Sequence, residues 1–116
     1  MAANTETLDL RDGALQTVYV TAPNRDEALS IAKIVVGERL AACANVIDTV
    51  GSVYWWEGVL QEDVEAALIL KTQRNRVQDL CARIQAVHSY DCPCITAFKI
   101  DGGNPDYLNW IVKETQ

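Results

Sequence analysis

Apolar and polar positions alternate from residue 16 to residue 22, which is the spacing of a β-strand with one buried face. Val18 and Val20 are central apolar members of this run. Asn24, a residue type that favours helix N-caps, follows a proline at the end of the run. Apolar residues then recur three and four positions apart over residues 28–40. The pattern predicts a first strand followed by a first helix.

The middle of the chain has the pattern of a long β-hairpin. Residues 43–56 and 64–72 are rich in β-branched and aromatic side chains, which favour strands. Glu57 and Gly58 stand between these runs and are typical of a turn. We therefore expect the two runs to pair as antiparallel strands.

A second helix, a strand and a short final helix follow. Residues 77–87 carry apolar side chains with helical spacing, and residues 94–100 have the composition of a strand that follows a proline. Asn104 is a suitable N-cap and Pro105 is favoured at the first position of a helix. These signals predict a C-terminal helix after a glycine-containing loop.

The predicted order is that of the ferredoxin-like α+β fold, βαββαβ, with an antiparallel sheet covered by helices on one face. We assign residues 16–116 to a single domain of this kind, extended by the short C-terminal helix. Residues 1–15 carry three acidic side chains and no strong hydrophobic period, and we expect a disordered tail there.

The returning strand of the hairpin is apolar on both faces. Ala66, Leu68 and Leu70 point one way, whereas Ala67 and Ile69 point the other. A face open to water should carry polar residues at every second position. The helices can cover one face only, so a second copy of the chain is expected to cover the other, which predicts a homo-oligomer.

Composition and charge narrow the partners and the compartment. The 116 residues suit one domain, and a net charge of −6 disfavours nucleic acid and anionic membranes as partners. No apolar run is long enough to span a bilayer, and the first residues do not have the basic and apolar pattern of a secretory signal. We expect a cytoplasmic protein whose four cysteines are free thiols.

His88 is the one imidazole of the chain and lies at the predicted end of the second helix. The helix dipole favours a cation there, so His88 is a candidate metal ligand or proton-responsive contact at a subunit cleft. The alternative is a histidine that satisfies the last carbonyl groups of its own helix. Both interpretations remain open.

The cysteines offer a second, weaker candidate for a metal site. Cys92 and Cys94, with Cys81 and His88, have the ligand types that suit zinc or cuprous copper. The spacing argues against such a cluster, because a single rigid proline separates two of the thiols. Cys81 lies in an apolar helix stripe, and Cys43 has the setting of a core or interface residue.

Four further residues are candidates for an intersubunit pocket that holds a small anion or a metal: Glu57, Lys71, Tyr90 and Asp91. Lys71 ends an otherwise apolar strand, which suggests a specific role. The alternative is that these are ordinary charges at exposed strand ends. Tyr54 and the two tryptophans after it can stack on RNA bases, but without basic neighbours packing is the better interpretation.

Several ordered blocks resemble the CutA family of divalent-cation tolerance proteins. The resemblance extends from about residue 16 to residue 112. The blocks are Thr21-Ala22-Pro23, Arg39-Leu40-Ala41-Ala42-Cys43-Ala44-Asn45, Tyr54, Trp56-Glu57-Gly58, Ile69-Leu70-Lys71-Thr72, His88-Ser89-Tyr90-Asp91-Cys92-Pro93 and Tyr107-Leu108-Asn109-Trp110-Ile111.

The resemblance implies a ferredoxin-like subunit in a tight homotrimer, similar to the nitrogen-regulatory PII proteins, and a link to tolerance of copper and other divalent metals. In animal members it also implies anchoring of an enzyme at membranes. Metal ligands of some bacterial members correspond here to Val20, Val87 and His88, of which only His88 can ligate. The resemblance thus implies no required cofactor and at most weak copper or zinc binding at His88.

Three classes of function follow from these observations. The first is a trimeric metal-responsive or small-ligand binding module, and the second is a structural or interaction scaffold without direct metal binding. The third, a cysteine-dependent enzyme that pairs Cys43 or Cys92 with His88, has no supporting local motif. We therefore expect a protein that is not an enzyme.

Overall fold

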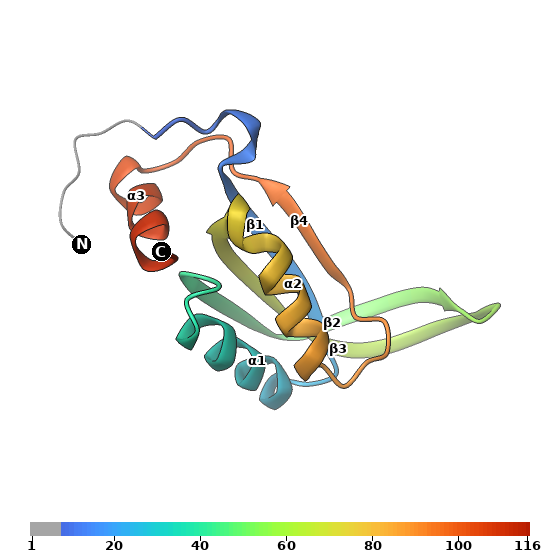
Figure 1. Cartoon of the computed structure of the whole chain (residues 1–116). Helices are drawn as coiled ribbons and strands as arrows, with labels where there is room; N and C mark the ends of the chain where they lie inside the picture. The colour runs from blue at the N-terminus through green and yellow to red at the C-terminus, as the bar shows by residue number, and fades with distance from the viewer. Residues whose placement is uncertain (1–7) are drawn as a thin grey trace.

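The computed structural model describes residues 8–116. Figure 1 shows the path of the chain through strands and helices in the order predicted from the sequence. The elements are η1 (Arg11–Gly13), β1 (Leu15–Ala22), α1 (Arg25–Gly37), β2 (Cys43–Trp56), β3 (Val59–Gln73), η2 (Arg74–Arg76), α2 (Val77–Val87), β4 (Ile95–Lys99) and α3 (Pro105–Glu114).

The four strands form one antiparallel sheet in the order β2-β3-β1-β4. Helices α1 and α2 lie on one face of this sheet (Figure 1) and bury alternate residues of the central strands, such as Val18 and Leu68. The Asn24 side chain caps α1 by accepting a hydrogen bond from the Glu27 backbone amide at 2.8 Å. The predicted ferredoxin-like α+β fold is confirmed.

The β2–β3 hairpin extends far beyond the helices (Figure 1), so that the molecule measures 51 × 25 × 23 Å. The returning strand begins at Val59, five residues before the predicted start at Val64. Its polar first half lacks a buried face, but pairing of Leu60 with Trp55 extends the ladder to the turn. Cross-strand partners therefore decide this boundary.

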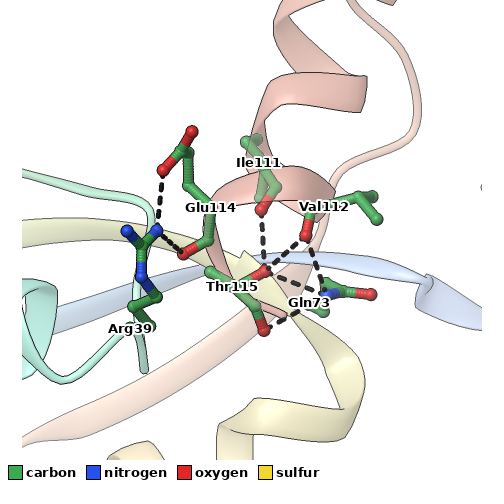
Figure 2. Close-up of polar contacts among 6 residues, drawn as sticks. All are labelled: Arg39, Gln73, Ile111, Val112, Glu114 and Thr115. Atoms are coloured by element: carbon green, nitrogen blue, oxygen red, sulfur yellow. Dashed lines mark hydrogen bonds and ion pairs between the residues drawn. The ribbon is translucent and has the colours of Figure 1, made fainter.

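Helix α3 packs on the end of the sheet remote from the hairpin tip (Figure 1). The Gln73 side-chain amide donates to Thr115 Oγ1 at 3.0 Å, and Arg39 Nη1 lies 2.8 Å from a carboxylate oxygen of Glu114 (Figure 2). Leu108 and Ile111 of this helix are buried against Leu15. The C-terminal helix is thus part of the packed domain.

The N-terminal segment differs in part from the predicted disordered tail at residues 1–15. Residues 1–7 of that tail lie outside the described residues. Leu8 and Leu10 pack against the cluster around α3, and β1 already begins at Leu15, whose side chain is fully buried. Burial of these leucines gives residues 8–15 a defined position that the acidic composition did not indicate.

Candidate functional site

A pocket of about 780 Å³ lies on the helix-free face of the sheet, at the base of the hairpin. Alternation along β1 and β3 puts Thr21 and Glu65 on this face and their neighbours Val20 and Ala66 in the core under the helices. The loop after α2 closes one side. The lining residues are Tyr19, Thr21, Val50, Gly51, Ser52, Val53, Tyr54, Trp56, Glu65, Tyr90, Asp91, Cys92, Pro93 and Cys94.

The Tyr90 hydroxyl donates a hydrogen bond to Glu65 Oε2 at 2.9 Å and thereby joins the loop to the pocket floor. Glu65 is only 8% exposed, which is unusual for a carboxylate. Burial, followed by the hydrogen bond to Glu65, raises the pKa of Tyr90 well above its usual range. The phenol therefore stays a neutral donor at physiological pH.

Tyr54, which also lines the pocket, forms a second tyrosine–carboxylate contact. Its hydroxyl donates to Asp63, and this hydrogen bond is the main reason that the pKa of Tyr54 is raised. Tyr54 and Asp63 stand on β2 and β3, on the same face as Glu65. Two neutral phenols thus donate hydrogen bonds to two carboxylates along this face, of which Glu65 is buried and Asp63 is exposed.

His88 has a structural role that differs from the predicted metal ligand. Its Nε2 atom lies 2.7 Å from the Thr21 carbonyl oxygen, and its Nδ1 atom lies 3.0 Å from the Tyr90 backbone nitrogen. A carbonyl can only accept and an amide N–H can only donate, so the ring is the neutral Nε2–H tautomer. Both ring nitrogens are used within the chain, and the side chain is fully buried.

This role is close to the alternative interpretation of His88, with one difference. The ring bonds to β1 instead of the last carbonyl groups of α2. The backbone amide of His88 reaches helix α2, where it donates to the Ile84 carbonyl at 2.9 Å. Glu27 lies 3.5 Å from the ring and accepts hydrogen bonds from Ser89, which ties the loop to α1 as well.

The four residues predicted to share an intersubunit pocket do not come together in one chain. Tyr90 and Asp91 line the pocket, whereas Lys71 and Glu57 do not. Lys71 pairs with Thr17 further along the sheet, and Glu57 stands in the turn at the hairpin tip with φ of 50°. Strand length separates these two residues from the pocket of their own chain, so their part in an intersubunit pocket stays a prediction that needs a second copy of the chain.

Sequence reasoning missed Glu65, the most buried acid of the site. Its signal is a charged side chain directly before the apolar run of β3, on the face that Ala67 and Ile69 continue. The pairing of Glu65 with Val50 follows an irregularity after Ile47 in β2, where the register shifts. That shift is not visible in the residue pattern, so the opposite neighbour was not predictable.

The cysteines do not assemble into the candidate cluster with His88. All four are free thiols, of which Cys92 and Cys94 are exposed at the pocket. Cys43 lies 3.3 Å from the Tyr107 hydroxyl, and burial raises the pKa of the half-buried Cys81. Within residues 8–116 no three histidine, cysteine or acidic side chains are placed to hold a metal ion.

Comparison with known proteins identifies the family. Residues 16–114 match the model of the family described as CutA1 divalent ion tolerance protein. The chain belongs to the CutA1 family. This confirms the resemblance that its ordered sequence blocks indicate.

Two relatives illustrate the range of the CutA1 family. Protein CutA 1, chloroplastic, of Oryza sativa is 42% identical over 99 residues, which is 85% of this chain and 56% of that protein. The divalent-cation tolerance protein CutA of Pyrococcus horikoshii is 41% identical over 99 residues, which is 85% of this chain and 96% of that protein. The chain therefore spans little more than half of the plant relative and nearly all of the archaeal one.

A solved structure of the family has the same fold. It is the periplasmic divalent cation tolerance protein CutA from Archaeoglobus fulgidus, with a TM-score of 0.85 and 36% identity over 88% of this chain and 99% of that chain. Because that relative is named as periplasmic, the cytoplasmic location of this chain stays a prediction. None of the helices formed by residues 8–116 is long and apolar enough to cross a membrane.

Proposed function

We propose that this chain is a homotrimeric, non-enzymatic binding module in divalent-cation tolerance, with its ligand site in the pocket beside Tyr90 and Glu65. The observation that carries the proposal is the 780 Å³ pocket on the face of the sheet that the helices leave uncovered. Pockets of this volume suit small molecules and combine apolar walls with a few placed polar groups.

The projecting hairpin supports self-assembly. Beyond the helices it exposes apolar side chains on both faces, including Trp55 and Val64, which are 71% and 70% exposed, on one face and Trp56 and Val59 on the other. Such surface is costly in water and favours burial against a second copy. The number three comes from the family resemblance, since a single chain does not specify it.

The residues of one chain do not fit a bound copper or zinc ion. Both nitrogens of His88 are engaged in hydrogen bonds, and Val20 and Val87 offer no donor atom. Tight sites for these metals need three or four ligands. We therefore place no metal chemistry at His88, and we propose that the link of the family to cation tolerance is indirect here.

Binding, not catalysis, agrees with the side-chain chemistry. A thiol enzyme needs a base within reach of its nucleophile. The imidazole of His88 is committed to Thr21 and Tyr90, and Cys43 contacts a phenol. The proposal also includes a cytoplasmic location, which agrees with four free thiols.

The scaffold alternative rests on the same exposed hairpin. Trp55 and Leu60 form a cross-strand pair on the helix side of the hairpin, where helices of the same chain do not reach. If a partner protein binds over this pair, the function of the chain would be to hold that partner in a complex. A trimer whose melting temperature no small molecule raises would favour this alternative.

A ligand panel tests the proposal. Ser52 lines the pocket, so Ser52→Trp should fill it, whereas Ser30→Trp adds the same bulk at an exposed position of α1. We expect at least one small molecule to raise the melting temperature of the wild type and of Ser30→Trp but not of Ser52→Trp. Stabilisation that survives Ser52→Trp, or no stabilisation by any compound, would contradict a ligand site in this pocket.

A further inference from the structure

The charge of the pocket has one sign. Its ionisable lining consists of the carboxylates of Glu65 and Asp91 with tyrosines and cysteines, and its described lining residues include no lysine, arginine or histidine. Lys71, the residue that suggested an anion, lies outside the lining. An anion entering this site would meet these carboxylates and no compensating cation from the same chain, so the lining that one chain contributes repels anions and attracts cations.

Glu65 is the strongest single reason for a cation. It is 8% exposed, and among residues 8–116 its side chain accepts one hydrogen bond, from the neutral Tyr90 hydroxyl at 2.9 Å. No lysine, arginine or histidine nitrogen in residues 8–116 lies within ion-pair distance of it. A buried carboxylate without a counter-charge is costly, and a bound cation would offset part of that cost.

The aromatic walls favour an organic cation over a metal ion. Tyr19, Tyr54, Trp56 and Tyr90 all line the pocket. Aromatic rings attract ammonium groups through the negative faces of their π-systems. The same rings can also cover the apolar carbon skeleton of an organic cation. A divalent metal would need a set of closely placed donor atoms, which the described residues do not provide.

We infer that the pocket binds a small organic cation, with an ammonium group beside Glu65 and its carbon skeleton between the aromatic side chains. This inference rests on the proposed function, because it names the ligand class of that same pocket. The volume of about 780 Å³ exceeds that of a single ammonium ion and leaves room for an attached aliphatic chain.

Three probes of equal chain length but different charge test the ligand class: putrescine, butanediol and succinate. Binding to the full chain is measured by calorimetry and melting temperature at low and moderate salt. We expect putrescine to bind and to raise the melting temperature, and we expect the neutral diol and the dianion to have little effect. The response should disappear in Ser52→Trp and persist in Ser30→Trp.

Glu65→Gln removes the charge and keeps the shape, and it should weaken putrescine binding roughly tenfold or more. Glu62→Gln is the matched control, since Glu62 lies on the same strand, faces the other side and is exposed. Equal affinity of the two variants for putrescine would show attraction to the overall negative charge and overturn the inference. Trp56→Ala, at a half-exposed position, should also weaken binding and provides a test independent of the buried acid.

The outcomes separate the two proposals. Binding of succinate or butanediol that depends on the pocket would overturn the cation inference and leave the proposed ligand site standing. Absence of binding by putrescine and by every other compound of the panel would overturn both. Putrescine binding that is lost in Glu65→Gln and retained in Glu62→Gln supports both.

Discussion

His88 and Thr21 are joined by a hydrogen bond of 2.7 Å between the imidazole Nε2 atom and the backbone carbonyl oxygen. The two residues lie 67 positions apart: His88 directly follows α2, and Thr21 is the second-last residue of β1. Since the other ring nitrogen accepts from the Tyr90 amide, one buried side chain holds the pocket loop to the sheet. These contacts give His88 a structural role that requires no metal ion.

Replacing this side chain should therefore affect stability. We expect His88→Ala to lower the free energy of unfolding by about 1–3 kcal/mol, because a buried carbonyl and a loop amide lose their partner. Urea denaturation measures the change. Lys33→Ala, at an exposed position of α1, is the control and should stay within about 0.5 kcal/mol of the wild type. A similarly small effect of His88→Ala would contradict the anchoring role.

Metal binding should not depend on His88. Calorimetric titration with copper or zinc should give the same heats for the wild type and for folded His88→Ala, since neither ring nitrogen has a free lone pair in the native contacts. Circular dichroism of the variant checks that it is folded. Tight binding by the wild type that His88→Ala loses would restore the predicted metal site.

The apolar part of the helix-free face around Ile69, which borders the ligand pocket at Tyr19, should form the subunit interface. Ile69 is half-buried at the centre of this face, next to Tyr19 on the neighbouring strand. Light scattering at micromolar concentration should give a trimer for the wild type and smaller species for Ile69→Asp, because an unpaired charge is costly in an apolar interface. Lys33→Asp introduces the same residue on an exposed helix face and should leave the trimer intact. A trimeric Ile69→Asp would place the interface elsewhere.

Tyr107 should titrate late. Its hydrogen bond with the Cys43 thiol, followed by burial, raises the pKa of Tyr107 to about 12. A raised native pKa means that the contribution of this phenol to stability is complete below its unfolded pKa, near 10, and is lost as pH rises towards 12. Ultraviolet absorbance of tyrosinate should lose a component that titrates near pH 12 in Tyr107→Phe. An unchanged absorbance change near pH 12 in Tyr107→Phe would contradict the assignment.

Thiol reactivity should divide the cysteines into two pairs. Cys92 and Cys94 are exposed, whereas Cys43 and Cys81 are half-buried and burial raises the pKa of Cys81. Alkylation near neutral pH, followed by mass spectrometry, should label the exposed pair first, because the thiolate is the reactive form. All four should react in denaturant without a reductant. Only two reactive thiols under those conditions would reveal a disulfide and another compartment.

The sequence by itself determined the order of elements, because hydrophobic spacing is a local property. The helical spacing of residues 77–87 and the apolar alternation around Leu68 follow from the need to bury one face. The same reasoning identified β3 as apolar on both faces. It also placed the N-cap at Asn24, since the cap contact spans only three residues.

Only the tertiary structure decided the composition of the pocket and the role of His88. The irregularity after Ile47 sets the partner of Glu65, and the loop after α2 brings Tyr90 to that carboxylate. Lys71 and Glu57 belong to the same hairpin but lie too far along it to line the pocket of their own chain. Register and loop path depend on contacts between residues distant in sequence, which no local pattern encodes.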